Sequence, residues 1–163
     1  MTRTIINSKI CCFIDKYPNW REILKNEYRI NIKEEYPFAI FNYGIDCDFS
    51  DPIVQEARGI IINIEDCNVV CWPFRKFGNY NESYADEIDW NTARVQDKID
   101  GSIIKLWWNE YSEKWQFSTN SIINAADALA NQMTQETFLD IIRRADNYND
   151  LLLRLPILNK NFT

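Results

Sequence analysis

The middle of the chain alternates short apolar runs with polar turns, and this alternation predicts β-strands. The predicted strands fall at residues 38–43, 57–64, 68–72, 95–98, 102–108 and 114–118. Only the polar turn 65–67 separates the second strand from the third, which favours a hairpin. In the fifth, Ile104, Leu106 and Trp108 share one side, so that side is predicted to face the core.

Apolar residues spaced by three and four predict helices towards both ends of the chain. One helix is expected over residues 4–15, and a second begins at Asn19, where Glu22 completes a capping box. Two more are expected in the C-terminal part, one begun by Asn124 with Asp127 and one capped by Thr134.

These elements together predict an α+β fold, a mostly antiparallel sheet with flanking helices. A chain of 163 residues fits a single domain. Within 1–163 we expect an N-terminal helical part at 1–35, a strand-rich part at 36–120 and helices at 121–163. Three charged or asparagine-rich segments are predicted to be irregular, at residues 30–36, 44–52 and 76–84.

Composition is that of a soluble globular chain and narrows the chemistry. Apolar residues make up 46% of the chain and charged residues 26%. No apolar run approaches the roughly 20 residues of a membrane span, and the N-terminus lacks a signal-peptide core, so we expect a cytoplasmic location and no membrane partner. The five cysteines lack paired ligand spacing and histidine is absent, so no metal site is predicted and Lys, Asp and Glu are the candidate catalysts.

The distribution of charge matters more than its sum. The net charge of −6 disfavours a protein that coats nucleic acid without specificity. The cations gather in the middle of the chain, at Arg58, Arg75, Lys76, Arg94, Lys98 and Lys105. A local basic pocket is therefore compatible with an acidic protein.

The stretch 98–101, Lys-Ile-Asp-Gly, places a lysine after the strand-like run 92–96 and before a turn glycine. A lysine is nucleophilic only when neutral, so burial or nearby cations must lower its ordinary pKa of about 10.4. Arg58 and Lys76 are the expected neighbouring cations, and Gly101 permits the turn that points Lys98 into a cleft. There it would attack the α-phosphate of a nucleoside triphosphate while Mg²⁺ and basic residues neutralise the pyrophosphate.

Each of these residues also has a plainer explanation. A lysine beside an Asp-Gly turn is usually exposed at a hairpin tip. Arg58 can pair with Glu56 on a surface strand, and Lys76 can lie over Phe77 and Tyr80. The four glycines form neither a Walker loop nor a dinucleotide fingerprint. Spacing alone leaves these interpretations open.

Three linked motifs favour the chemical interpretation. They are Glu56-Ala57-Arg58-Gly59-Ile60-Ile61, then Trp72-Pro73-Phe74-Arg75-Lys76-Phe77-Gly78-Asn79-Tyr80-Asn81-Glu82, then Lys98-Ile99-Asp100-Gly101-Ser102. Their order and spacing across about residues 38–125 resemble the adenylylation domain of phage-type RNA ligases, the class of RNA ligase 1.

The resemblance implies a partial ATP-grasp-like nucleotidyltransferase domain in which Lys98 becomes covalently attached to AMP. It implies that Arg58 and Lys76 hold the triphosphate, with Asp100 and Gly101 at the same nucleotide site. ATP with Mg²⁺ is then the donor. AMP would pass to an RNA 5′-phosphate, and the break would be sealed to a 3′-hydroxyl, which is RNA repair.

The chain departs from this family in two places. Near 117–121 the family often has a basic residue and a glycine, and this chain has Thr119 and Asn120. A strand-borne glutamate motif expected after Phe162-Thr163 is missing, as are a later glutamate and paired lysines. We therefore expect an incomplete ligase domain, as a truncated piece, a split gene product or a degenerate copy. Alone it is expected to have weak or no activity, with a second polypeptide as the source of the missing motifs.

Two alternatives stay open. Another lysine nucleotidyltransferase, such as a DNA ligase or a capping guanylyltransferase, would share Lys-x-Asp-Gly. A non-catalytic binding domain would keep the fold without the chemistry, which the acidic net charge and the absent motifs favour.

Overall fold

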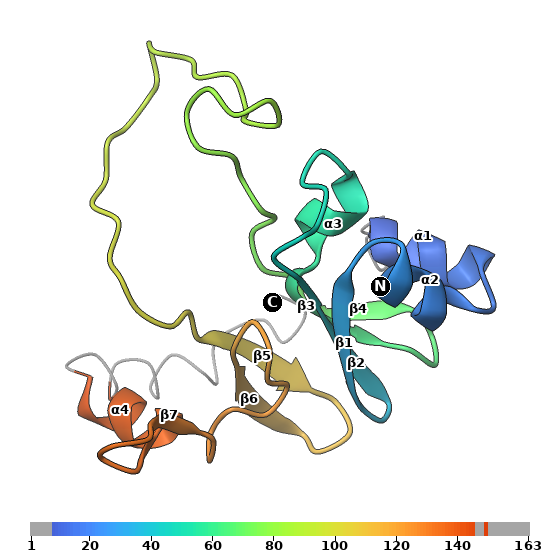
Figure 1. Cartoon of the computed structure of the whole chain (residues 1–163). Coiled ribbons are helices and arrows are strands. Elements are labelled where there is room, and N and C mark those ends of the chain that lie inside the picture. The colour runs from blue at the N-terminus through green and yellow to red at the C-terminus, as the bar shows by residue number, and fades with distance from the viewer. Residues whose placement is uncertain (1–7, 146–148, 150–163) are drawn as a thin grey trace, which may run out of the picture.

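The computed structural model describes residues 8–145 and residue 149. In chain order its elements are α1 (Lys9–Lys16), α2 (Trp20–Asn26), β1 (Ile30–Glu35), β2 (Phe38–Tyr43), α3 (Pro52–Glu56), β3 (Arg58–Asn63), β4 (Asn68–Cys71), β5 (Lys105–Asn109), β6 (Lys114–Ser118), β7 (Leu129–Asn131), β8 (Glu136–Thr137) and α4 (Phe138–Arg144). Antiparallel sheets with few helices confirm the predicted α+β class (Figure 1). The predicted helix residues 4–7 and everything from 150 onwards lie outside the described residues.

The main sheet is antiparallel in the order β1-β2-β3-β4, and it buries both of its faces. On one face, β2 and β3 pack against the helices, with side chains that include Ala39, Phe41, Ile60, Ile62, Trp20 and Leu24. On the other face lie Phe38, Ile40, Ile61 and Cys71, together with Trp107 of β5. Strands with apolar residues on both faces read as continuous apolar runs, which is why β2 and β3 were predictable.

The hairpin of β5 and β6 covers the second face of the main sheet. Trp107 is fully buried there and meets the Phe38 ring edge-on, with 5.1 Å between ring centroids. In β5, Trp107 lies on the buried side, whereas Leu106 and Trp108 are half-buried. The predicted core side was therefore wrong. Both alternating sets in 102–108 contain apolar residues, so period-two alternation did not decide between them.

Residues 30–36 were predicted to be a loop, and this was wrong. They contain β1, which pairs with β2 in unbroken register from Ile30 with Tyr43 to Glu35 with Phe38. β1 is an edge strand, and charged exposed side chains such as Lys33 and Glu34 are typical of such an edge. The three charged residues of β1 hid its strand pattern in the sequence.

The segment 72–104 joins β4 to β5 and forms no helix or strand. In Figure 1 it is the long green-to-yellow trace that runs away from the main sheet. The strand predicted at 95–98 is therefore wrong, and Val95 in it is fully exposed. Polar residues flank Val95 on both sides, so pairing this run would bury little apolar surface.

Helix starts were predicted less well than strands. α2 begins beside Asn19 as expected, but the Asn19 side chain makes no capping hydrogen bond. The helix predicted from Asn124 is wrong, because the chain there forms turns that lead into β7. The last cap is Thr137 rather than Thr134, and Thr137 shares a complete capping box with Asp140.

Candidate functional site

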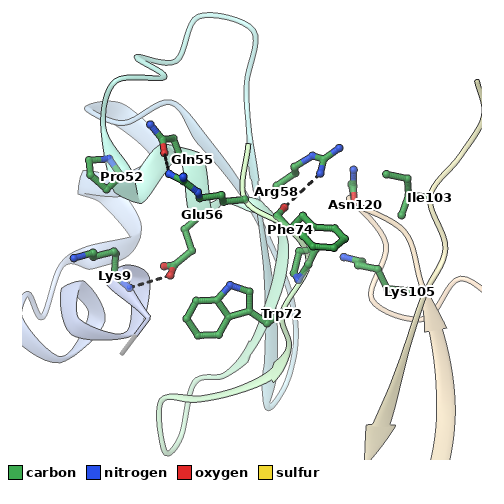
Figure 2. Close-up of a pocket in the computed structure, with 12 residues that line it drawn as sticks. Lys9, Pro52, Gln55, Glu56, Arg58, Trp72, Phe74, Ile103, Lys105 and Asn120 are labelled. Carbon is green, nitrogen blue, oxygen red and sulfur yellow. Dashed lines mark hydrogen bonds between the residues drawn. The ribbon is translucent and has the colours of Figure 1, made fainter. Parts of the chain in front are cut away.

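A cleft of about 740 Å³ lies between the β3–α3 corner and the β5–β6 hairpin (Figure 2). Its wall combines cations with aromatic and apolar side chains. The lining residues are Lys9, Pro52, Gln55, Glu56, Arg58, Trp72, Pro73, Phe74, Arg75, Ile103, Lys105 and Asn120. Concave, mostly apolar sites with a few placed polar groups are the usual form of small-molecule sites.

Arg58 is placed in this cleft by the strand that follows α3. It is the first residue of β3 and lies opposite Asn42 of β2, beside a register shift after Phe41. Its side chain is half-buried, with Nη1 3.4 Å from the Phe74 carbonyl oxygen and the guanidinium 5.2 Å from the Phe77 ring centroid. The hydrogen bond occupies one of the five N–H donors of the guanidinium.

Glu56 fixes the wall next to Arg58 and is not its ion-pair partner. Glu56 is 7% exposed, and its carboxylate accepts hydrogen bonds from Ser8 Oγ (2.9 Å), Lys9 N (3.1 Å) and Ile10 N (2.8 Å). The predicted surface pairing of Arg58 with Glu56 is therefore wrong. The negative charge lies at the N-terminus of α1, where the helix dipole favours it, and it ties α1 to the end of α3.

Gly59 lets the hairpin approach the sheet closely. Its φ is +86°, and a Cβ there would lie 2.6 Å from the Asn120 Cα and 2.6 Å from Lys105 Nζ. Glycine is needed on both counts, for the backbone angle and for the space. The β5–β6 hairpin and the loop after it, which form the wall opposite α3, therefore contact the backbone directly beside Arg58.

Lys105 is a buried cation of the cleft that sequence reasoning placed in no site. Its Nζ donates to the Gly59 carbonyl oxygen, and its side chain points towards the Phe74 side of the cleft in Figure 2. Burial lowers the pKa of Lys105 to about 8, although the nearby Cys71 thiol acts in the opposite direction. A lone lysine inside the apolar run 103–108 was the available signal, because a strand that buries this run buries its amine too.

Four of the five predicted site residues, Lys76, Lys98, Asp100 and Gly101, lie outside this cleft on the segment 72–104. Lys98 is exposed and its Nζ pairs with Asp100 Oδ1 at 2.9 Å, the two side chains being 88% and 95% exposed. The expected placement of Lys98 inside a cleft is therefore not found. Gly101 has the expected positive φ, +150°, with open space around it.

Lys76 lies over aromatic rings, as its plainer explanation predicts, but the rings are those of Phe49 and Tyr84 rather than Phe77 and Tyr80. Its ammonium lies 5.5 Å from the Phe49 ring centroid and 6.0 Å from that of Tyr84. Its backbone N–H donates to the Gln55 carbonyl oxygen at 2.7 Å, which anchors the start of the long segment to α3. Of the five predicted site residues, Arg58 alone lines the cleft, and the functional roles of all five stay predictions.

The cleft suits a polyphosphate better than it suits a metal ion held by the protein. Arg58 and Lys105 contribute cationic side chains to its lining, and Phe74, also in the lining, is 85% exposed. Both oxygens of Glu56, the one carboxylate of the lining, already accept hydrogen bonds. Among residues 8–145 and 149, no three Cys, Asp or Glu side chains gather closely enough to hold a metal, and no helix is long and apolar enough to span a membrane.

Comparison with known proteins shows distant similarity to viral proteins. The chain is 28% identical over 125 residues to "Putative bifunctional polynucleotide kinase/RNA ligase" of Autographa californica nuclear polyhedrosis virus, covering 68% of this chain and 18% of that protein. It is 25% identical over 155 residues to "Uncharacterized protein ORF64" of Ostreid herpesvirus 1 (isolate France), covering 88% of this chain and 38% of that one. No family model matches the chain. The chain thus spans less than two-fifths of either relative.

Proposed function

We propose that this chain carries the ATP-binding part of an RNA-ligase-type adenylyltransferase domain. The observation that carries the proposal is the cleft in which Arg58 and Lys105 face the same space beside an exposed aromatic ring. Distant similarity to a protein named for RNA ligase activity, and the three linked motifs, point to the same function.

The lining residues divide naturally between the two ends of ATP. Arg58 binds phosphate oxygens through its fork of N–H donors, and Lys105 adds a point charge from the opposite wall. Lys105 uses one of its three ammonium protons on the Gly59 carbonyl oxygen, which leaves two for phosphate. The exposed face of Phe74 takes the adenine ring by stacking.

Lys98 is the proposed nucleophile of the transfer step. Its neutral amine bonds to the α-phosphorus of ATP and loses a proton, while the bond to the pyrophosphate breaks. When bound to the phosphates, Mg²⁺ would supply positive charge that stabilises the leaving pyrophosphate. The proposal requires the segment 72–104 to carry Lys98 from its exposed pairing with Asp100 to the bound nucleotide. AMP then passes to an RNA 5′-phosphate, and attack by a 3′-hydroxyl joins the RNA and releases AMP.

The chain alone is proposed to transfer AMP weakly or not at all. The matched region of the chain covers 18% of the viral kinase/ligase relative, so most of that protein has no counterpart in the match. A second polypeptide that supplies further groups of the active site is part of the proposal.

Labelling with ATP tests the assignment of Lys98. The chain is incubated with Mg²⁺ and ATP labelled at the α-phosphate, with unlabelled ATP or GTP as competitor, and Lys98→Ala is the matched control. We expect faint covalent label in the native chain, no label in Lys98→Ala, and competition by ATP alone. Strong label on Lys98 contradicts the proposed weak activity, and equal competition by GTP favours a capping-type enzyme.

A second candidate function is a non-catalytic nucleotide-binding or RNA-binding domain. The exposed pairing of Lys98 with Asp100, 88% and 95% exposed, is the observation that favours it. In that case Lys98→Ala leaves ATP binding and RNA binding unchanged, and neither protein takes up covalent label even when unlabelled competitor is omitted.

A further inference from the structure

A second cleft lies at the β1 edge of the main sheet. Residues of α2, β1, β2 and the loop after β6 line it. It has a volume of about 590 Å³, and its lining is rich in cations and amides. The residues are Arg21, Lys25, Asn31, Ile32, Lys33, Glu34, Ile40, Asn42 and Ser121. We call this second cleft the basic groove.

The basic groove keeps a net positive charge inside an acidic protein. Its one carboxylate, Glu34, is engaged by Arg21 through two bonds, Nε to Oε1 at 2.7 Å and Nη2 to Oε2 at 3.0 Å. Lys25 and Lys33 are exposed, and neither ammonium group has an ion-pair or hydrogen-bond partner among the described residues. Two uncompensated ammonium groups therefore lie in one concave surface, which attracts anions.

Polar residues join the basic groove to the Arg58 cleft. Asn31 of β1 lies opposite Asn42 of β2, and Asn42 lies opposite Arg58 of β3. Asn31 and Asn42 share a face, and the register shift after Phe41 brings Arg58 opposite Asn42, so these three form a row about 10 Å long, two strand spacings, across the sheet. Ile40 is two residues before Asn42 and packs with Trp107, so the row lies on the face that the hairpin covers.

The loop after β6 spans both clefts at the same place. Asn120 lines the Arg58 cleft, and the next residue, Ser121, lines the basic groove. The two clefts are therefore neighbours along one polar track rather than separate sites on unrelated surfaces. A ligand that fills both must be long, flexible and repeatedly charged.

We propose that the basic groove binds the sugar–phosphate backbone of a single-stranded RNA whose terminal phosphate lies at Arg58. The inference rests on the proposed function, because that function places an RNA 5′-phosphate beside the nucleotide. Lys25 and Lys33 contact phosphates, and the amides of Asn31 and Asn42 offer donors and acceptors to 2′-hydroxyls and base edges. Arg21 is a positioning residue, fixed by Glu34 at the rim.

Fluorescence anisotropy with a labelled single-stranded RNA of about 12 nucleotides tests this directly. The test variant is Lys25→Gln/Lys33→Gln, and the matched control is Lys16→Gln/Lys114→Gln, two exposed lysines that line neither cleft. We expect the test variant to bind RNA at least about tenfold more weakly, and its log–log salt slope to fall by about 1.4 for two lost phosphate contacts. The control should keep both values.

The RNA end separates the two clefts. With 5′-phosphorylated and 5′-hydroxyl RNA, the groove variant should weaken both equally, whereas Arg58→Ala should remove the preference for the phosphate. ATP affinity measured in parallel should be unchanged in the groove variant. If the native chain binds no ATP, the proposed function fails, even where the groove variant still weakens RNA binding.

Several results would overturn the groove assignment itself. They are native protein that binds no RNA, a groove variant that matches its control, or a variant that loses binding to phosphatidylserine–phosphatidylcholine vesicles but not to RNA. Circular dichroism of both double variants confirms that the comparison is made between folded proteins.

Discussion

Arg58 and Lys98 are the two cations on which the proposed chemistry depends, and the fold treats them differently. Arg58 begins a strand whose next residues, Gly59 to Ile62, are all buried, and its backbone is paired on the β2 side. Lys98 lies on a 33-residue stretch, 72–104, without regular structure and pairs only with its near neighbour Asp100. The core positions Arg58, and local charge alone positions Lys98.

The difference means that the Arg58 wall of the cleft is formed before nucleotide binds, whereas Lys98 must still move to that wall. The Arg58 wall is held by the buried Glu56 bonds and by the close contact at Gly59, so it exists before any nucleotide arrives. Lys98 must travel to that wall, and moving it costs little, because an exposed ion pair is worth at most about 1 kcal/mol. Nucleotide binding and covalent transfer should therefore respond to different substitutions.

The largest expected effect is on the prebuilt wall. Glu56→Ala leaves the three donors of Ser8, Lys9 and Ile10 without their acceptor, so we expect the free energy of unfolding to fall by about 3 kcal/mol. Glu56→Gln keeps one acceptor oxygen and the side-chain volume, and should lose less. Urea unfolding at pH 7 measures both. Equal stability of Glu56→Ala and native protein would show that this carboxylate does not hold the wall.

Two of the three glycines in the motifs, Gly59 and Gly101, give a matched pair. Gly59→Ala meets both a positive φ and atoms 2.6 Å from the new Cβ, so we expect a loss of about 2 kcal/mol or more. Gly101→Ala meets only an unfavourable φ in open space, so about 1 kcal/mol is expected. Thermal unfolding of both variants decides the order. Equal losses would mean that the hairpin does not press on Gly59.

The pH dependence of ATP affinity should report Lys105. Its folded pKa of about 8 lies below the ordinary value of 10.5, so its ammonium loses its proton first in the folded protein. Phosphate binding needs the charged form, so affinity should be flat below pH 8 and fall above it, by up to about tenfold per pH unit. Lys105→Met should bind more weakly and show no such fall. A native profile that is flat to pH 9.5 would exclude Lys105 from the phosphate site.

The smallest effect is expected at Lys98. Lys98→Ala removes an exposed pair with Asp100 and should leave the urea midpoint unchanged within error. A clear loss of stability would show that Lys98 makes structural contacts, and the contrast with Arg58 would then disappear.

Sequence patterns predicted strand positions well where apolar residues outnumber charged ones, most clearly in β2 and β3, which are buried on both faces. The predictions for 38–43 and 114–118 coincide with β2 and β6, and the run 68–72 exceeds β4 by one residue. β1 was missed because an edge strand has few buried positions and tolerates charge. Its apolar residues are too few to outweigh the charged ones in a pattern read along the chain.

The site was harder to predict, for a different physical reason. Arg58 lines the cleft because it begins a strand whose following residues are buried, and its nucleotide-binding role stays a prediction. Lys105 was not recognised, since its importance depends on Gly59, which is 46 residues away in the chain. The position of Lys98 followed from neither periodicity nor motif, because nothing buried holds its segment.

Calorimetric titration of ATP into the native chain, Arg58→Ala and Lys98→Ala separates nucleotide binding at Arg58 from the role of Lys98. We expect one bound ATP for the native chain, at least about tenfold weaker binding for Arg58→Ala through the lost phosphate contacts, and nearly native affinity for Lys98→Ala. A native chain that binds no ATP, or Arg58→Ala with native affinity, would contradict the proposed function.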